Sequence, residues 1–292
     1  MYSELASIGA TKKTLEAFGL SAKYKLGQNF LVSDEIVGKI VRLAQLSNKD
    51  VVLEIGPGIG TLSLALLKIV DGLCSIEQDK DLIPVLKSNL SEYESSLCLI
   101  NDDALKVGEQ EIGQALDRLH LMRAMPNRLV SNLPYAIAAT LILQYFQTFD
   151  FIEDMTVMVQ SEVADRIAAQ SSSKIYGAYT VKLALYADVV GRFQVSPQHF
   201  FPKPRVESSV IKLKRKDEIH QGLTKNQKLA VCKVIDAAFL QRRKTIRNSM
   251  SQNYPKELLD LAFETANIDS QLRAEVLELD DFIRLTKALK TI

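Results

Sequence analysis

Short apolar runs alternate along most of the chain with longer segments in which apolar residues recur every three or four positions. The short runs have the length and composition of buried strands, and the longer segments have the period of amphipathic helices. The predicted strands are residues 51–55, 73–77, 97–100, 128–130, 155–160, 189–195 and 208–214. The predicted helices are residues 11–18, 33–46, 61–69, 80–89, 136–146, 161–169 and 178–186. Strands that alternate with helices predict an α/β fold with a largely parallel sheet.

The pattern changes near residue 216. Beyond it no alternating segment follows, and the remaining apolar patterns have the helical period: residues 225–240, 242–250, 256–266 and 280–289. We therefore predict two domains. An α/β domain with an N-terminal arm covers residues 1–216, and a smaller all-helical domain covers residues 217–292.

Composition restricts the classes of protein that these elements can build. Of the 292 residues, 47% are hydrophobic and 24% are charged, which is ordinary for a soluble globular protein. No apolar run approaches the roughly 18 residues of a membrane span, and the first residues do not resemble a secretory signal. Three cysteines and three histidines are too scattered for a disulfide framework or a zinc site. We expect a cytoplasmic protein with buried free thiols, which binds neither membrane nor metal.

A polar and aromatic stretch follows the predicted strand at 128–130. It lies where ligands of open α/β sheets bind, and it reads Ser131, Asn132, Leu133, Pro134 and Tyr135. An amide, a proline that leaves carbonyl groups exposed and an aromatic face suit a planar ring with an exocyclic amine, such as adenine. A simple strand-to-helix turn also favours Asn and Pro. The other strand ends must therefore decide between a ligand site and a turn.

Those strand ends also carry residues that suit a nucleotide. The first strand leads into a glycine loop at 56–60 before a helix, although the dinucleotide fingerprint G-x-G-x-x-G is absent. Glu77 ends the second strand, where an acid can accept from ribose hydroxyl groups. Asp103 follows the third strand, where a carboxylate can accept from an adenine amine. Together with Asn132, these residues predict one ligand site along the carboxyl edge of the sheet.

Positive charge is concentrated in one part of an almost neutral chain. The net charge is +1, yet residues 196–256 contain 14 Lys or Arg and 4 Asp or Glu. Such a segment is the electrostatic signature of a polyanionic partner, although a solvated charged surface is the alternative. Residues 196–206 add proline and aromatic rings, a combination typical of contact with nucleic acid. Arg242 and Arg243, between two predicted helices, are candidates for phosphate contact.

The motifs and their order resemble those of the ribosomal RNA small subunit adenine dimethyltransferases (KsgA/RsmA type). The matching segments are residues 24–31, 54–60, 77–79, 103–104, 132–135, 200–209 and 241–248. The resemblance covers about residues 20–290, and its combination of N-L-P-Y, G-Q-N-F-L and F-x-P-x-P-x-V-x-S is highly specific. It implies a Rossmann-like class I methyltransferase domain followed by a helical domain that binds RNA.

The resemblance also implies a reaction. S-adenosylmethionine would be the methyl donor, and the partner would be small-subunit rRNA within a precursor small ribosomal subunit. Two adjacent adenosines near the 3′ end of that rRNA would each receive two methyl groups on the exocyclic nitrogen. The protein, a monomer, would also act late in the assembly of the small subunit.

Residue by residue, the resemblance implies three groups. The donor would be bound by Gln28, Asn29, Leu31, Gly56, Gly58, Glu77, Gln78, Asp103, Ala104 and Asn132. The target adenine would be held by Asn132, Leu133, Pro134, Tyr135 and Phe200. RNA would be bound by Lys203, Arg205, Arg242, Arg243, Lys244 and Arg247. Two assignments have a neighbour as the alternative, Asp102 for Asp103 on the donor adenine and Phe201 for Phe200 on the target base.

The mechanism needs mainly alignment, since the donor already carries a good leaving group. The target base would leave its stack, and its amine would donate to the Asn132 side chain and to the carbonyl of Leu133 or Pro134. Two alternatives share the fold, an Erm-type methyltransferase of large-subunit rRNA and a non-catalytic nucleic-acid-binding assembly factor. Residues 26–31 and Leu133 favour the small-subunit enzyme, and the intact donor motifs favour catalysis.

Overall fold

The computed structural model describes residues 1–23, 27–216 and 222–290, which form two compact units. Unit 1 comprises Met1–Ala164 and Val189–Lys214, and unit 2 comprises Asp165–Asp188 and Arg215–Ile292. The predicted boundary near residue 216 lies beside the last crossing between the units. Residues 165–188, however, were assigned to the α/β domain and instead pack with the C-terminal helices.

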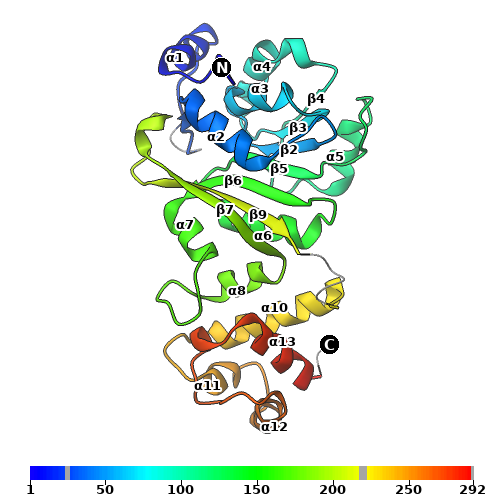
Figure 1. Cartoon of the computed structure of the whole chain (residues 1–292), viewed down its shortest axis with the longest axis vertical. Coiled ribbons are helices and arrows are strands. Elements are labelled where there is room, and N and C mark those ends of the chain that lie inside the picture. Colours follow the sequence, from blue (N-terminus) through cyan, green and yellow to red (C-terminus); the bar gives the residue numbers. More distant parts are fainter. Residues whose placement is uncertain (24–26, 217–221, 291–292) are drawn as a thin grey trace. The chain divides into compact units, whose positions relative to one another are not determined.

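The sheet of unit 1 has seven strands within the described residues, in the order β4-β3-β2-β5-β6-β9-β7 (Figure 1). These are β2 (Val51–Ile55), β3 (Gly72–Ile76), β4 (Leu97–Ile100), β5 (Arg128–Asn132), β6 (Asp154–Gln160), β7 (Ala187–Val195) and β9 (Ser208–Arg215). Strands β2 to β6 pair in parallel, and β9 joins β6 antiparallel. The chain moves outward from β2 through β4 and returns on the other side with β5. The topological switch therefore lies between β2 and β5, where open α/β sheets bind ligands.

Helices cover both faces of this sheet (Figure 1). On one face lie α2 (Asp34–Ala44), α3 (Thr61–Leu67) and α4 (Ile83–Asn89), and on the other lie α5 (Glu109–Leu116) and α6 (Ala138–Thr148). A buried cluster joins the first group to the strands through Ile40, Leu66, Leu86, Val130 and Met158. The sequence pattern predicted these helices except α5. Short 3₁₀ helices are η2 (Lys80–Leu82), η3 (Ser91–Tyr93) and η4 (Pro197–His199).

Two short strands form a ribbon apart from the sheet. Strand β1 (Phe30–Leu31) pairs antiparallel with β8 (Phe200–Phe201), with Phe30 opposite Phe201 and Leu31 opposite Phe200. Opposite residues of such a pair share a face. Leu31 and Phe200 accordingly belong to the same buried cluster as Ile40, Leu66 and Val130, between the helices and the sheet. Phe30 belongs to a second cluster with Ile59 and Leu15.

Leu15 belongs to the N-terminal helix α1 (Ile8–Ala17). The sequence predicted that this helix begins at Thr11, but it begins one turn earlier. The Ser7 side chain caps it by accepting from the Ala10 N–H at 3.1 Å. Thr11 is thereby inside the helix and buried, and its hydroxyl donates to the Ser7 carbonyl at 2.9 Å.

Apart from the ends of β7 and β9, the regular elements of unit 2 in its described residues are helices. It contains α8 (Ala178–Ala184), α10 (Lys225–Phe239), α11 (Ile246–Met250), α12 (Lys256–Ala266), η5 (Ala274–Val276) and α13 (Leu279–Ala288), while α7 (Ser161–Ile167) crosses from unit 1. Its core includes Val231, Ile235, Leu259 and Phe282, each fully buried. Helix α11 begins later than the predicted residue 242 because the Thr245 side chain caps it. Among the described helices, none combines the length and the apolar character needed to cross a membrane.

Candidate active site

The glycine loop after β2 and the stretch after β5 meet at the topological switch. Gly56 has a φ of +64°, and a Cβ atom there would lie 3.3 Å from Cγ of Pro134. Gly58 has a φ of +62°, and a Cβ atom there would lie 3.1 Å from the Phe30 ring. Only glycine adopts this backbone region without strain. The loop can therefore lie close to both rings, which puts the expected donor site directly beside the expected adenine site.

Asn132 is the last residue of β5 and is half-buried. Its Nδ2 donates to the Asn29 carbonyl at 3.3 Å, and this bond ties the end of β5 to the residue before β1. The preceding Ser131 hydroxyl donates to the Ile55 carbonyl at 2.6 Å, which fixes β5 against β2. The Asn132 Oδ1 accepts no hydrogen bond from the described part of the chain. This orientation leaves an amide oxygen available for a donor such as an exocyclic amine.

The two backbone carbonyls after Asn132 differ in their hydrogen bonds. The Pro134 carbonyl accepts from the N–H groups of Ile137 at 3.2 Å and Ala138 at 3.1 Å, at the start of α6. The Leu133 carbonyl receives no donor from the residues that the structure describes, although its N–H donates to Met158. Of the two carbonyls that the sequence left open, the one of Leu133 therefore has the free lone pairs.

Tyr135 is held by its hydroxyl group. That hydroxyl and the Ser208 hydroxyl, at the start of β9, lie 2.6 Å apart, and Ser208 is fully buried. Burial raises the pKa of Tyr135, and the bond to Ser208 only partly opposes this, so the phenol is neutral at physiological pH. The half-buried ring is thus fixed beside Asn132, as an aromatic platform for a base requires.

The two candidate stacking rings of β8 have different surroundings. Phe200 is 1% exposed and belongs to the core with Leu31 and Val130. Phe201 is half-buried, and the Lys12 ammonium lies 5.4 Å from the centre of its ring. A base can stack only on an accessible face. In this structure Phe200 stabilises the core, and a base would reach it only after a movement of the β1–β8 ribbon.

Glu77, directly after β3, has the features expected of a ribose ligand. It is 7% exposed, its Oε1 accepts from the Asp79 N–H at 2.8 Å, and its Oε2 accepts from the Gly58 N–H at 3.3 Å. Burial raises its pKa, and these backbone bonds partly oppose the shift. A carboxylate can accept about four hydrogen bonds, so two remain for a pair of ribose hydroxyls. The glycine backbone and this carboxylate together fit the adenosyl part of a methyl donor.

Gln28 is bound to a neighbour of Glu77. Its Nε2 donates to Oδ2 of Asp79 at 2.8 Å, and the Lys23 ammonium donates to Oδ1 of Asp79 at 2.6 Å and to Asp81 at 2.7 Å. The Asn29 side chain donates to the carbonyl of Gly27 within its own turn. Both side chains lie in the matched segment 24–31, of which residues 24–26 lie outside the described residues. The sequence analysis did not predict this network around Asp79.

The remaining donor candidates follow β3 and β4 and differ in their exposure. Gln78 is exposed, Asp102 is exposed and accepts from the Asp103 N–H at 2.6 Å, and the half-buried Asp103 accepts from the Leu105 N–H at 3.0 Å. Ala104 is buried, and its carbonyl accepts from Tyr145 at 2.8 Å. Each carboxylate keeps one oxygen without a hydrogen bond from the described residues. The choice between Asp102 and Asp103 for the donor adenine thus stays a prediction.

Glu54 lies beneath the glycine loop and was not among the predicted site residues. It is 1% exposed near the carboxyl end of β2, and one carboxylate oxygen accepts from Ser63 of α3 at 2.6 Å and from Ser75 of β3 at 3.1 Å. Burial raises the pKa of Glu54 to about 7, and the nearby charge of Glu77 acts in the same direction. An acid inside an otherwise apolar strand is the sequence signal that marks it. It fixes the strand before the loop to the helix after it.

Comparison with known proteins agrees with this geometry. The model of the family "Ribosomal RNA adenine dimethylase" matches residues 19–291. The chain belongs to the ribosomal RNA adenine dimethylase family. It is 38% identical over 283 residues to the ribosomal RNA small subunit methyltransferase A of Clostridium botulinum (strain Okra / Type B1), covering 97% of this chain and 99% of the relative. It is 37% identical over 287 residues to the protein of the same name from Magnetococcus marinus, covering 96% of each.

Solved structures share the fold at lower identity. A dimethyladenosine transferase from Plasmodium falciparum superimposes with a TM-score of 0.70 at 23% identity, covering 87% of this chain and 94% of that one. The 23S rRNA methyltransferase ErmE superimposes with a TM-score of 0.65 at 23% identity, covering 90% of this chain and 100% of that one. The predicted Rossmann-like methyltransferase fold with a helical C-terminal part is thus confirmed.

The predicted RNA-binding residues of this dimethylase are not equally available. Lys203 and Arg205 of unit 1 are exposed, and neither has a partner among the described residues. In unit 1, Lys212 is instead buried and donates to the Ala44 carbonyl at 2.9 Å. The charge count of the basic segment therefore includes cations that support the fold.

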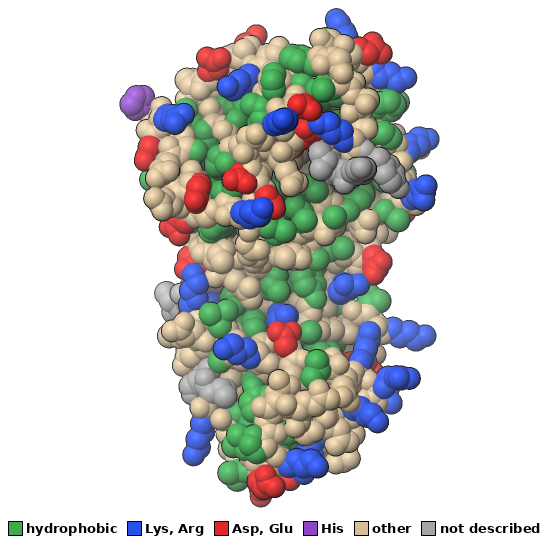
Figure 2. Space-filling model, turned by 180° about the vertical axis from the view of Figure 1, so that it is seen from behind, with side chains coloured by type: hydrophobic (Ala, Val, Ile, Leu, Met, Phe, Trp, Pro, Cys, Tyr) green, Lys and Arg blue, Asp and Glu red, His purple; other side chains and the backbone are tan. Residues whose placement is uncertain are grey.

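Unit 2 shows the same division. Arg242 donates to Glu275 at 3.2 Å and to the Tyr176 carbonyl at 3.3 Å, and Arg247 binds Asp260 at 2.7 Å. Arg243 and Lys244 are exposed without a partner in the described ranges. Figure 2 shows Lys and Arg side chains scattered over this unit on the displayed face.

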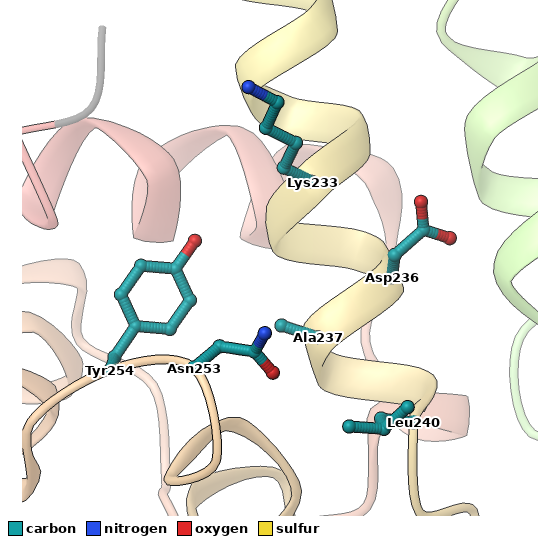
Figure 3. A pocket seen from close by; sticks show the side chains of 6 residues that line it. All are labelled: Lys233, Asp236, Ala237, Leu240, Asn253 and Tyr254. Atoms are coloured by element: carbon teal, nitrogen blue, oxygen red, sulfur yellow. The ribbon is translucent and has the colours of Figure 1, made fainter.

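Unit 2 also has a hollow of about 410 Å³ beside α10. Figure 3 shows the residues that line it: Lys233, Asp236, Ala237, Leu240, Asn253 and Tyr254. None of the predicted RNA-binding residues is among them.

Proposed function

We propose that this protein dimethylates two adjacent adenosines near the 3′ end of small-subunit rRNA, with S-adenosylmethionine as the methyl donor. Membership of the adenine dimethylase family and the small-subunit activity named for its relatives support the substrate. The observation that carries the proposal is the pair of free acceptors, Asn132 Oδ1 and the Leu133 carbonyl, beside the glycine loop.

The donor would be held by residues around the topological switch. Glu77 accepts from the ribose hydroxyls, the backbone at Gly56 and Gly58 lies against the donor, and Asp103 accepts from its adenine amine. S-adenosylmethionine supplies a methyl group on a positively charged sulfur, which is a good leaving group without further activation. The chain's own task is therefore to orient the acceptor amine and to exclude water.

Two acceptors match the two hydrogens of an unmethylated adenine amine. Asn132 Oδ1 and the Leu133 carbonyl each accept one N–H. These two bonds orient the amine so that the lone pair of its nitrogen faces the methyl group of the donor. Tyr135 holds the ring by stacking, with its hydroxyl fixed on Ser208. The first transfer adds a methyl group to the amine nitrogen, which loses one of its two hydrogens as a proton. One N–H remains, so one acceptor no longer has a hydrogen to bind and must make room for the new methyl group. A site that dimethylates needs this tolerance, which a free backbone carbonyl provides without moving a side chain.

The RNA would be held by exposed cations with no ion pair in the described chain. These are Lys203 and Arg205 in unit 1, and Arg243 and Lys244 in unit 2. Phosphate contacts of this kind position the RNA without reading its sequence. We further propose that the protein acts as a monomer on a late precursor of the small ribosomal subunit.

Mass spectrometry of rRNA after incubation with the protein and labelled donor tests the proposal. Unmethylated small and large subunits serve as separate substrates, because they distinguish the small-subunit enzyme from an Erm-type enzyme. We expect two adjacent dimethyladenosines in small-subunit rRNA and none in large-subunit rRNA. Methylation of the large subunit alone would overturn the substrate. Absence of donor binding in calorimetry would indicate a non-catalytic assembly factor.

A further inference from the structure

Helix α1 lies outside the segment matched by the family model, which begins at residue 19. Its buried side chains are Thr11 and Leu15, and Leu15 packs in a cluster with Phe30 of β1 and Ile59 of the glycine loop. This packing anchors α1 against the outer face of the β1–β8 ribbon. The α1 side chains that neighbour Leu15 are thus held next to the ribbon and the glycine loop of the expected active site.

Lys12, one turn before Leu15, is the residue presented there. Its ammonium lies 5.4 Å from the centre of the Phe201 ring, and its side chain is exposed. No carboxylate of the described residues forms an ion pair with it. Some lysines of unit 1 do form such pairs, namely Lys23, Lys39, Lys68 and Lys106, whereas others in the described residues, such as Lys13 and Lys203, do not. A cation held in place over a ring, without a negative partner in the described chain, can accept one from a ligand.

Lys12 is linked to the reaction site through the ribbon. Phe201 lies opposite Phe30, and the residue before Phe30, Asn29, accepts the hydrogen bond from Asn132. A nucleotide whose base reaches Asn132 keeps its flanking phosphates outside the base site, because extrusion rotates it about an intact backbone. Those phosphates must lie outside the base site, and Lys12 is the cation that the ribbon links to that site.

We propose that Lys12 contacts a backbone phosphate flanking the target adenosine. This inference rests on the proposed function, since the phosphate belongs to the RNA that the protein is proposed to methylate. A lysine binds phosphate as a point charge, so the contact would position the nucleotide without selecting its base. Lys12 would thus be a positioning residue supplied by the helix that precedes the family's matched region.

The adjacent Lys13 is a matched control. Successive helix residues are turned by roughly 100°, so Lys13 lies about 200° from the buried Thr11, away from the ribbon. It is also exposed and has no ion pair with the described residues. Lys12→Met and Lys13→Met therefore remove the same charge from the same helix, and only the first removes it from beside the Phe201 ring of the ribbon.

The test measures methylation of unmethylated small subunits between about 0.1 and 0.3 M potassium salt at constant magnesium. We expect Lys12→Met to raise the KM for the subunit about five-fold at 0.1 M salt, because one lost phosphate contact lowers the salt slope by about 0.7. Lys13→Met should match the wild type, Lys12→Arg should restore the slope, and donor affinity and melting temperature should stay unchanged in all variants.

Several outcomes would overturn the inference. If Lys12→Met and Lys13→Met raise KM equally, the rise comes from the loss of positive charge on the helix in general, and Lys12 makes no specific phosphate contact. If Lys12→Met lowers only the melting temperature, the lysine merely holds α1 on Phe201. A wild-type protein that methylates no subunit contradicts the proposed function itself, and is thereby distinguishable from both of these results.

Discussion

Replacement of Glu54 by glutamine tests the electrostatics beneath the glycine loop. Glu54 is 1% exposed, and burial raises its pKa to about 7, above the usual 4.5 of an unfolded chain. A group whose pKa is raised by folding stabilises the protein fully below the unfolded pKa. That stability is lost as the pH rises through the folded pKa. The wild-type protein should therefore lose stability between mildly acidic and mildly alkaline pH through this one residue.

The size of the loss follows from the shift in pKa. Each pKa unit corresponds to about 1.4 kcal/mol, so the Glu54 contribution to the free energy of unfolding falls by about 2.5 kcal/mol between about pH 5 and pH 8. Glutamine does not titrate, and its oxygen can accept from Ser63 and Ser75 as the carboxylate oxygen does. Any penalty from the new amide N–H groups is the same at every pH. The difference between the two proteins thus isolates the ionisation of Glu54.

Urea unfolding at a series of pH values, with m-values compared between proteins, provides the measurement. Glu54→Gln should gain about 2.5 kcal/mol relative to the wild type over this pH range. Glu92→Gln, on the exposed η3, removes a carboxylate from the surface and should follow the wild type. A constant difference between Glu54→Gln and wild type from pH 5 to pH 8 would refute the reasoning, because Glu54 would then not change its charge in this range.

Three further expectations concern the site. Asn132→Ala should lower the methylation rate by about 10² to 10³ while calorimetry shows donor binding largely retained through the other donor residues; a wild-type rate would remove Asn132 from the mechanism. Because burial raises the pKa of Glu77, donor affinity measured by calorimetry should fall as the pH decreases through the mildly acidic range, and Glu77→Gln should lose this dependence; a pH-independent wild type would contradict the ribose contact. Phe200→Leu should lower stability by about 1 kcal/mol, seen as a lower melting temperature, whereas Phe201→Leu should change it little; equal shifts would contradict the burial of Phe200.

The sequence predicted the sheet well because its strands are nearly continuous apolar runs. Strands β2 and β4 have the predicted bounds, and the others differ by a few residues at their ends. Buried parallel strands are apolar on both faces, and the residues that follow them are polar or glycine, so both signals are local. For the same reason the linear pattern was sufficient to predict that Gly56, Glu77 and Asn132 lie at one edge of the sheet.

Long-range pairing of short segments could not be predicted in this way. Strands β1 and β8 have two residues each, which is too short for any period, and they come from distant parts of the chain. Their register nevertheless decides which ring is buried, because it puts Phe200 on the core face with Leu31 and Phe201 on the outer face with Phe30. The sequence motif thus indicated two candidate rings, Phe200 and Phe201, and only the pairing of β1 with β8 shows which of them is buried.

Charge was the second property that the linear sequence could not resolve. The basic segment ends at residue 256, but the carboxylates that bind two of its arginines come later, as Asp260 for Arg247 and Glu275 for Arg242. Counting charges within residues 196–256 therefore overestimates the number of cations that can bind a phosphate without breaking an ion pair. Ion pairs that hold unit 2 together would have to break before these arginines could bind RNA, whereas Arg243 and Lys244 require no such exchange. The RNA contact of unit 2 should accordingly depend on the middle two of the four cations and not on the outer two.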